Sequence, residues 1–239
     1  MSAHNPEILL GKLTRREFRQ RMQSSQLQAA ILPVAAIEQH LEHLAMEHDW
    51  RSVNEIAARV ARRLAPRVLV AQGVMAGISQ HHMRHPGTLS LRPGSFLAVV
   101  ADLIDSLVRA GFKNILVLNG HGGNIAPCEG IWGQFLQINE INLQFVSYWD
   151  TIDHLEARRC MSTPDVPGHA QEFETAIALA AFAENVRTQM WTDQPDQAPS
   201  QATAETGERL LELCVAGVER YLREMLDGKR VAEIPPFMP

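Results

Sequence analysis

A glutamate and a histidine stand two positions apart where an apolar segment ends. The segment Ile-Leu-Pro-Val-Ala-Ala-Ile leads into Glu38 and His40, and Asp49 follows nine residues after the histidine. If the segment is a strand, positions i and i+2 share a face and lie about 6.5–7 Å apart. That span suits two ligands of different ions in a metal pair, whose separation is usually about 3.5–4 Å. Carboxylate and imidazole suit Zn, Mn or Fe, and the alternative is a solvated strand end with an incidental acid and histidine.

A glycine-rich turn carries a second candidate ligand. Residues 114–119 are mainly apolar and continue into Gly-His-Gly-Gly-Asn, which contains His121, Gly122 and Gly123. Glycines let backbone N–H groups approach a ligand, so the turn could hold an anion. It lacks the GxGxxG spacing of a dinucleotide site and the Gly-Lys-Ser/Thr of a P-loop. We interpret His121 as a ligand rather than a core residue, and the two glycines as substrate contacts.

Strands and helices alternate along the chain. The apolar patterns predict strands at about residues 28–36, 67–74, 114–119 and 143–149, and helices at about 52–64, 93–110 and 125–139. This order predicts the α/β class, with a mainly parallel sheet between two helical layers in a three-layer αβα arrangement. Ligands of such sheets collect at the carboxyl ends of the strands. Because Glu38, His40 and His121 all follow predicted strands, we expect them to meet at that edge.

The remaining segments complete the predicted elements. Thr14 and Glu17 form a capping-box pattern for a short surface helix at residues 13–23. Residues 153–167 are expected to be irregular, residues 168–183 helical, residues 192–204 a loop and residues 204–226 a long amphipathic helix. Glu172 falls in the first turn of its helix, where the helix dipole alone would favour an acid.

Composition narrows the function classes. The 239 residues are 46% hydrophobic and 21% charged with a formal net charge of −5, which predicts a single domain over residues 1–239. No basic face points to a nucleic-acid partner, and no apolar run is long enough to span a membrane. Three widely spaced cysteines indicate neither a disulfide framework nor a cysteine zinc site. With no apparent signal peptide, the expected compartment is the cytoplasm.

Four sequence motifs follow one another in an order that is far more specific than any one of them alone. They are residues 32–40 (Leu-Pro-Val-Ala-Ala-Ile-Glu-Gln-His) with Asp49, residues 86–91 (Pro-Gly-Thr-Leu-Ser-Leu), residues 119–124 (Asn-Gly-His-Gly-Gly-Asn) and residues 169–175 (His-Ala-Gln-Glu-Phe-Glu-Thr). Together they span about residues 28–185 and resemble the creatininase (creatinine amidohydrolase) family. The resemblance implies a creatininase-like α/β fold, two divalent metal ions (Zn or Mn, with Fe in some members) and a homohexamer.

The resemblance also implies the ligands of the two ions. Four residues match the family's metal ligands, namely Glu38, His40, Asp49 and His121. Creatininase itself has a carboxylate ligand inside the Asn-Gly-His loop, where this chain has Gly123, so the resemblance moves the fifth ligand to Glu172. Asp49 would bridge the ions, Glu38 and His121 would complete one, and His40 and Glu172 the other.

Further site residues follow from the same motifs. His169 matches a histidine at the family's reaction centre and would act with Glu172 in catalysis, as proton shuttle or oxyanion partner. His82 precedes the Pro-Gly-Thr motif and is expected to touch substrate. Trp149 follows a strand on the active edge and is either a pocket wall or a core residue. The chain departs from the family's pattern at residues 41–43 and 46–48, which are Leu-Glu-His and Met-Glu-His here.

Three functions remain open on this evidence. The leading one is hydrolysis of a C–N bond in a small cyclic amide or formamide by a metal-activated water. The second keeps the metal centre and hydrolyses a C–C bond in a cyclic keto-sugar derivative. The third is a non-catalytic ligand-binding member of the family, suggested by the altered residues 41–48.

Overall fold

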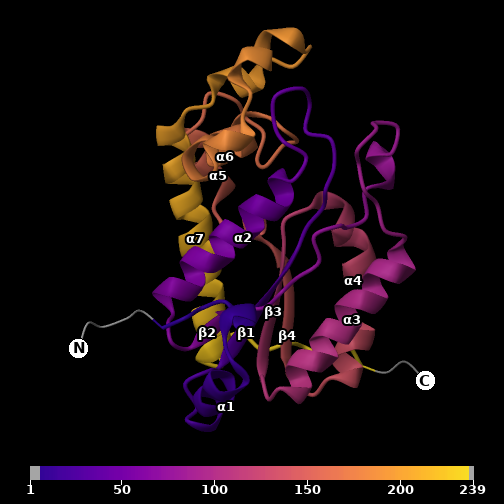
Figure 1. The fold of residues 1–239 in the computed structure, drawn as a ribbon, viewed down its shortest axis with the longest axis vertical. Helices are drawn as coiled ribbons and strands as arrows, with labels where there is room; N and C mark the ends of the chain where they lie inside the picture. The colour runs from indigo at the N-terminus through magenta and orange to yellow at the C-terminus, as the bar shows by residue number, and fades with distance from the viewer. Residues whose placement is uncertain (1–5, 237–239) are drawn as a thin grey trace.

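A four-stranded sheet forms the centre of the molecule. The computed structural model describes residues 6–236, and all neighbouring strands are parallel in the order β2-β1-β3-β4 (Figure 1). The strands are β1 Ala29–Val34, β2 Val68–Val70, β3 Asn114–Asn119 and β4 Asn142–Ser147. β1 pairs with β3 along its whole length, from Ala29 opposite Asn114 to Val34 opposite Asn119. The α/β class expected from the sequence is therefore confirmed.

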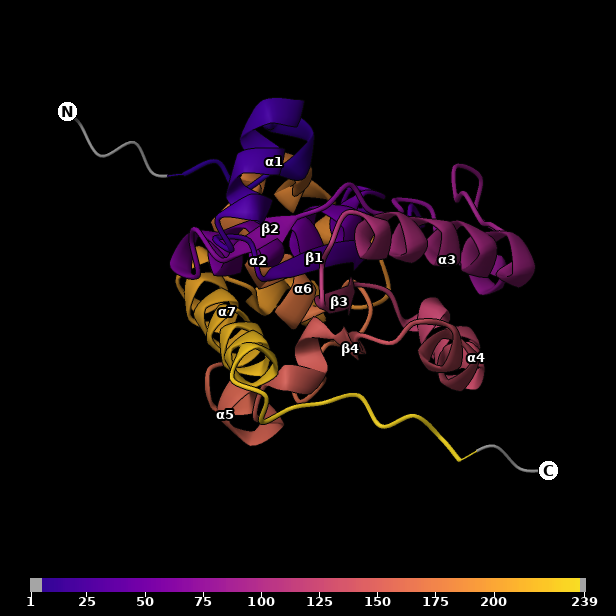
Figure 2. The same ribbon diagram turned by 90° about the horizontal axis from the view of Figure 1, so that it is seen from below.

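Helices cover both faces of the sheet. α2 His48–Arg63, α6 Glu172–Ala181 and α7 Ala204–Leu226 pack on one face, and α3 Pro93–Arg109 and α4 Ile125–Ile138 on the other (Figure 2). Alternation along β1 sorts the core, since Ala29 and Ile31 join the α2 face while Ala30 and Leu32 join the α3 face. The three-layer αβα architecture is thus confirmed.

The smaller helices lie outside these layers. α1 Arg15–Gln23 starts with the expected capping box between Thr14 and Glu17, and its Phe18 packs edge-on against Phe112. α5 His154–Arg159 forms in a segment expected to be irregular, and it is capped by Asp153. No helix within residues 6–236 combines the length and apolar character needed to cross a lipid bilayer.

The strand order places a crevice above β1 and β3. The chain leaves β1 through α2 to reach β2 on one side, and it returns through α3 to β3 on the other side. Ligands of open α/β sheets bind where the order reverses, outside the carboxyl ends of the strands. Glu38 and His40 follow β1, and His121 follows β3, so all three candidate ligands lie at this point.

β2 is shorter than its apolar sequence predicts. Its ladder stops at Val70, and beyond it only an isolated bridge joins Val74 to Val34. Pro33 explains the interruption. Its carbonyl accepts from Val74 on the β2 side, so its missing N–H also lies on that side. The strand predicted for residues 67–74 therefore forms only three paired residues.

Candidate metal centre

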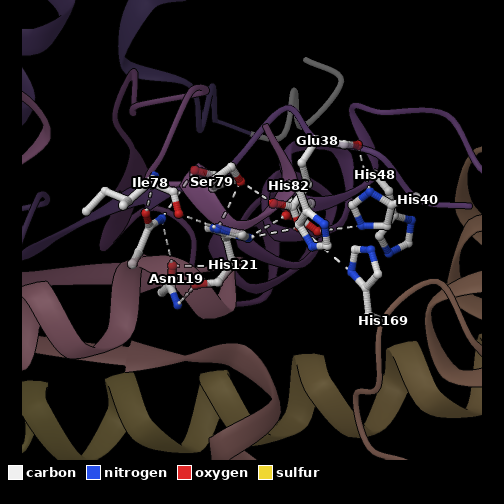
Figure 3. A network of polar contacts seen from close by, with 12 residues as sticks. Glu38, His40, His48, Ile78, Ser79, His82, Asn119, His121 and His169 are labelled. Atoms are coloured by element: carbon white, nitrogen blue, oxygen red, sulfur yellow. Dashed lines mark hydrogen bonds and ion pairs between the residues drawn. The ribbon is translucent and has the colours of Figure 1, made fainter. Parts of the chain in front are cut away.

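Three acids and two imidazoles converge at the carboxyl edge of the sheet. Glu38 and His40 come from the segment after β1, Asp49 from the first turn of α2, His121 from the turn after β3, and Glu174 from the first turn of α6. All five residues are at most 4% exposed. Figure 3 shows Glu38, His40 and His121 pointing toward one another within this polar network. Burying so many ionisable groups together requires a compensating charge.

One half of the cluster is built from Glu38, Asp49 and His121. Nδ1 of His121 lies 3.0 Å from Oδ2 of Asp49 and 3.3 Å from Oε1 of Glu38. The opposite ring nitrogen, Nε2, donates to the backbone carbonyl of Ile78 at 3.0 Å. That second contact orients the ring so that Nδ1 faces the two carboxylates, as the outer hydrogen bond of a metal-bound histidine does.

The other half is built from His40, Asp49 and Glu174. Nε2 of His40 lies 3.0 Å from Oδ1 of Asp49 and 3.8 Å from Oε2 of Glu174. Nδ1 of His40 donates to the carbonyl of Glu38 at 3.0 Å, which fixes this ring in the same way. Asp49 thus presents one carboxylate oxygen to each half, as a carboxylate that bridges two ions would.

The cluster strongly favours positive charge. Burial opposes protonation of His121, but the carboxylates of Asp49 and Glu38 that face Nδ1 of its ring raise its pKa to about 10. Burial likewise opposes protonation of His40, and Asp49 and Glu174 raise its pKa to about 9. In the metal-free protein these rings therefore hold protons at neutral pH. A bound cation would take the place of those protons.

The donor set fits a pair of divalent cations. Oδ2 of Asp49 is buried and has no hydrogen-bond partner among residues 6–236, although it faces Nδ1 of His121. An unpaired buried carboxylate oxygen is costly unless something else satisfies it, and a cation between these groups would do so. Carboxylate and imidazole donors are those that Zn²⁺ and Mn²⁺ accept.

The placement of Glu172 corrects the sequence prediction. Its carboxylate accepts from the backbone N–H groups of Ser162 and Thr163, the nearest at 2.7 Å, and does not join the cluster. Successive helical residues are about 100° apart, so residues 172 and 174 point to nearly opposite sides of α6. Glu174 faces the site and Glu172 holds the preceding loop, which makes Glu174 the fifth candidate ligand. The same placement leaves Glu172 without the predicted catalytic position.

The predicted substrate contacts line one cavity beside the cluster. It has a volume of about 500 Å³, and its walls include His82, Gly122, Gly123, Trp149 and His169. Trp149 is both 7% exposed and part of the wall, so the two interpretations of this residue are compatible. Among residues 6–236, the side chains that line this cavity include no Lys or Arg.

His82 and His169 lie beside the cluster, and both contact its Glu38. Each has one ring nitrogen 3.8 Å from Oε1 of Glu38, and the two rings stack with centroids 4.6 Å apart. Burial, together with the charge of nearby His40, lowers the pKa of His169 to about 4. Burial also lowers the pKa of His82. Both imidazoles are therefore neutral near pH 7.

Sequence reasoning missed two residues that support the site. Ser79 donates a hydrogen bond to Oε2 of Glu38, and its Oγ lies 3.2 Å from Nε2 of His121. Gln39 contacts both His82 and His169 through its side-chain amide. Gln39 stands between the two β1-derived ligands in the sequence, and this position was the only signal that could have pointed to it.

The altered segment at residues 41–48 packs behind the site. Its histidines are fully buried: His43 contacts Thr175 and Gln194, and His48 contacts Ser52. Neither ring lines the cavity, and the ring of His48 packs against that of His40, with centroids 5.1 Å apart.

Fold and site together define an α/β protein with a candidate binuclear metal centre at its sheet switch point. The sequence profile of the Creatininase family (Creatinine amidohydrolase) matches residues 11–201. The chain belongs to the creatininase family of hydrolases.

Curated relatives and solved structures agree with this assignment. Creatinine amidohydrolase of Pseudomonas putida is 26% identical over 91% of this chain and 96% of its own. The 3-dehydro-scyllo-inosose hydrolase of Thermotoga maritima is 27% identical over 72% of this chain and 55% of its own. A crystal structure of creatininase superposes with a TM-score of 0.79 at 26% identity, covering 91% of this chain and 98% of that one. Related creatininase structures include Zn-Zn and Mn forms.

The turn after β3 explains why the fifth acid comes from α6. A Cβ atom at Gly123 would lie 2.1 Å from the carbonyl oxygen of Ile78 and 2.5 Å from Nε2 of His121. Position 123, where the family resemblance would otherwise place a loop carboxylate, therefore has no room for a side chain here. Glu174 supplies a carboxylate to the same cluster from the opposite side.

Proposed function

We propose that this protein is a metal-dependent hydrolase that cleaves a C–N bond in a small cyclic amide or formamide. The observation that carries the proposal is the bridging position of Asp49, with one oxygen facing His40 and the other facing His121. Two divalent cations held there would polarise a carbonyl and lower the pKa of a water molecule. Membership of the creatininase family supports the same reaction class.

The residues around the cluster would position the substrate. Trp149 and Pro167 give the cavity apolar walls. Gly122 leaves space beside it, since among residues 6–236, apart from its chain neighbours and its own helix backbone, no atom lies within 4 Å of a Cβ built there. Neutral His82 and His169 would hydrogen-bond a carbonyl or a leaving nitrogen. Among residues 6–236, the lining offers no Lys or Arg side chain to pair with a substrate carboxylate.

Turnover with and without metal tests this proposal. The protein is stripped with a chelator, reloaded with Zn²⁺ or Mn²⁺, and incubated with creatinine, small lactams, formamides and short peptides while amine release is measured. We expect amine release from at least one uncharged amide only after reloading. Equal turnover by stripped and reloaded protein would overturn the proposal.

A C–C bond hydrolysis is the second candidate. The match to 3-dehydro-scyllo-inosose hydrolase favours it, because that relative acts on a cyclic keto compound by its name. Incubation of the reloaded protein with cyclic keto-inositols, followed by mass spectrometry, separates the two functions. Ring opening to a carboxylic acid without amine release would assign the second function, and ligand binding without turnover of either substrate class would assign a non-catalytic role.

A further inference from the structure

Gln39 lies between the two histidines that face the cluster. Its side-chain Nε2 is 2.9 Å from Nδ1 of His82 and 2.8 Å from Nε2 of His169. Its Oε1 accepts a hydrogen bond of 3.0 Å from the backbone N–H of Leu41. Because a backbone N–H can only donate, the amide oxygen must face Leu41 and the NH₂ group must face the two rings.

This arrangement specifies where each imidazole carries its proton. An amide NH₂ can only donate, so Nδ1 of His82 and Nε2 of His169 must each offer a lone pair. An imidazolium has no lone pair, and each ring is therefore a neutral imidazole. The single ring proton must then sit on Nε2 of His82 and on Nδ1 of His169.

Both of these N–H groups face the reaction centre. Nε2 of His82 and Nδ1 of His169 each lie 3.8 Å from Oε1 of Glu38, which itself is 3.3 Å from Nδ1 of His121. At 3.8 Å neither N–H is hydrogen-bonded to that carboxylate. Both N–H groups therefore remain available to donate to a substrate atom that lies between the two rings. His82 and His169 also line the cavity, which gives a substrate oxygen access to this position.

The turn that follows Gln39 holds the amide in place. Leu41 has a φ of 56°, in the left-handed region that few side chains adopt without strain. This conformation directs its N–H back to Oε1 of Gln39. The Leu41 side chain packs against the core on the α2 side of the sheet.

We propose that Gln39 is a positioning residue that locks His82 and His169 as opposite tautomers, so that both present N–H donors to one substrate oxygen. This inference rests on the proposed hydrolase function. Two preorganised donors aimed at an oxygen on which negative charge develops would stabilise the transition state of carbonyl addition. Glu38, His82 and His169 also lie close enough together to hold a metal ion. The proposed tautomers exclude this, because a ring nitrogen that carries a proton cannot bind a metal ion.

Solid-state NMR of protein labelled with ¹⁵N only in histidine tests the tautomers directly. The zinc-loaded protein is used because Zn²⁺ is diamagnetic, and the two rings are assigned by the signals lost in His82→Asn and His169→Asn. In the wild type we expect a proton on Nε2 of His82 and on Nδ1 of His169. In Gln39→Glu the new carboxylate can only accept, so we expect protons on Nδ1 of His82 and Nε2 of His169.

Two further variants complete the experiment. Gln80→Glu adds the same charge on an exposed residue that, within residues 6–236, makes no side-chain hydrogen bond to either ring, and it should keep the wild-type tautomers. Gln39→Met removes the amide without adding charge, and each ring should then show a mixture of tautomers. Identical ring protonation in wild type, Gln39→Glu and Gln39→Met would overturn the proposal, as would a third zinc ion lost in His82→Asn.

The outcome can be separated from that of the proposed function. The tautomers are measured without substrate, so they test Gln39 even if no amide is cleaved. Once a substrate is found, Gln39→Glu should lower kcat by about 10²-fold with unchanged metal content, the size expected for losing preorganised donors. Unchanged kcat with reversed tautomers would overturn the role of the two N–H groups while leaving the hydrolase assignment in place.

Discussion

Two acids at the start of α6 have separate tasks. Glu174 lies 3.8 Å from Nε2 of His40 in the cluster, and Glu172 accepts from the backbone of Ser162 and Thr163. The loop that Glu172 holds leads to His169, so this residue contributes to the site through the loop rather than through an ion. Each acid can therefore be tested with the same substitution.

We predict that Glu174→Gln lowers the metal content from two ions per chain to one. An amide offers no negative charge to the half-site of His40, whereas the half-site of His121 keeps both its carboxylates. The matched control Glu172→Gln should keep both ions and lose about 1–3 kcal/mol of stability, because the carboxylate that accepts from the backbone N–H groups of Ser162 and Thr163 is replaced. Elemental analysis and thermal melting check this pair, and the reverse pattern of metal loss would contradict it.

The raised pKa values predict how pH affects the metal-free protein. His40 and His121 have folded pKa values of about 9 and 10, above their ordinary value of 6.5, so the folded state holds these protons more tightly than the unfolded state. By linkage, the stability they contribute is full below pH 6.5 and is lost as pH rises through 9 and 10. Glu174, whose pKa burial raises to about 8 although His40 opposes this, acts in the same direction.

Thermal melting between pH 6.5 and 10 measures this effect. The Tm of chelator-treated protein should fall over that range. The Tm of zinc-loaded protein should fall less, because cations then replace the protons. A Tm of the stripped protein that stays level or rises would show that the cluster is not held together by protonated histidines.

At the scale of elements, the turn between β3 and α4 depends on one of its two glycines. A Cβ atom at Gly123 would collide with Ile78 and His121. Among residues 6–236, one at Gly122 would meet no atom within 4 Å apart from its chain neighbours and its own helix backbone. We predict that Gly123→Ala displaces His121 and sharply weakens metal binding, while Gly122→Ala keeps it. Zinc titration of stripped protein compares the two, and equal affinities would refute the close packing of this turn.

The elements show what the sequence could and could not reveal. Continuous apolar runs predicted β1 and β3, and the strand–turn order predicted that Glu38, His40 and His121 would meet at one edge. It did not predict that α2 begins at His48, because Glu47 provides no side-chain cap. The choice of Glu172 over Glu174 failed for a related reason: both lie in the first turn of α6, and only the rotation of the packed helix decides which one faces the site.

At the scale of the whole molecule, we propose that the chains assemble with one another. The resemblance implies a homohexamer, and exposed apolar side chains such as Met75, Met83 and Leu89 offer surface for contacts between chains. We predict a particle of six 26.7 kDa chains by light scattering at micromolar concentration. A monomer at that concentration would contradict this prediction without affecting the metal centre.

The fold joins distant segments into one site in a way that local patterns do not show. Asp49 and Glu174 are 125 positions apart, and they meet because α2 and α6 pack on the same face of the sheet. Gln39 reaches His169 across a similar separation. Such contacts depend on the packing of helices against the sheet, so the sequence predicted the edge at which the site forms but not its full set of side chains.

The number of metal ions per chain tests the central claim most directly. Protein purified without chelator is analysed for Zn, Mn and Fe alongside its Asp49→Ala variant, which removes the carboxylate that faces both halves of the cluster. The proposed centre predicts two ions per chain in the wild type and none in the variant. A wild type without metal, or a variant that keeps both ions, would contradict it.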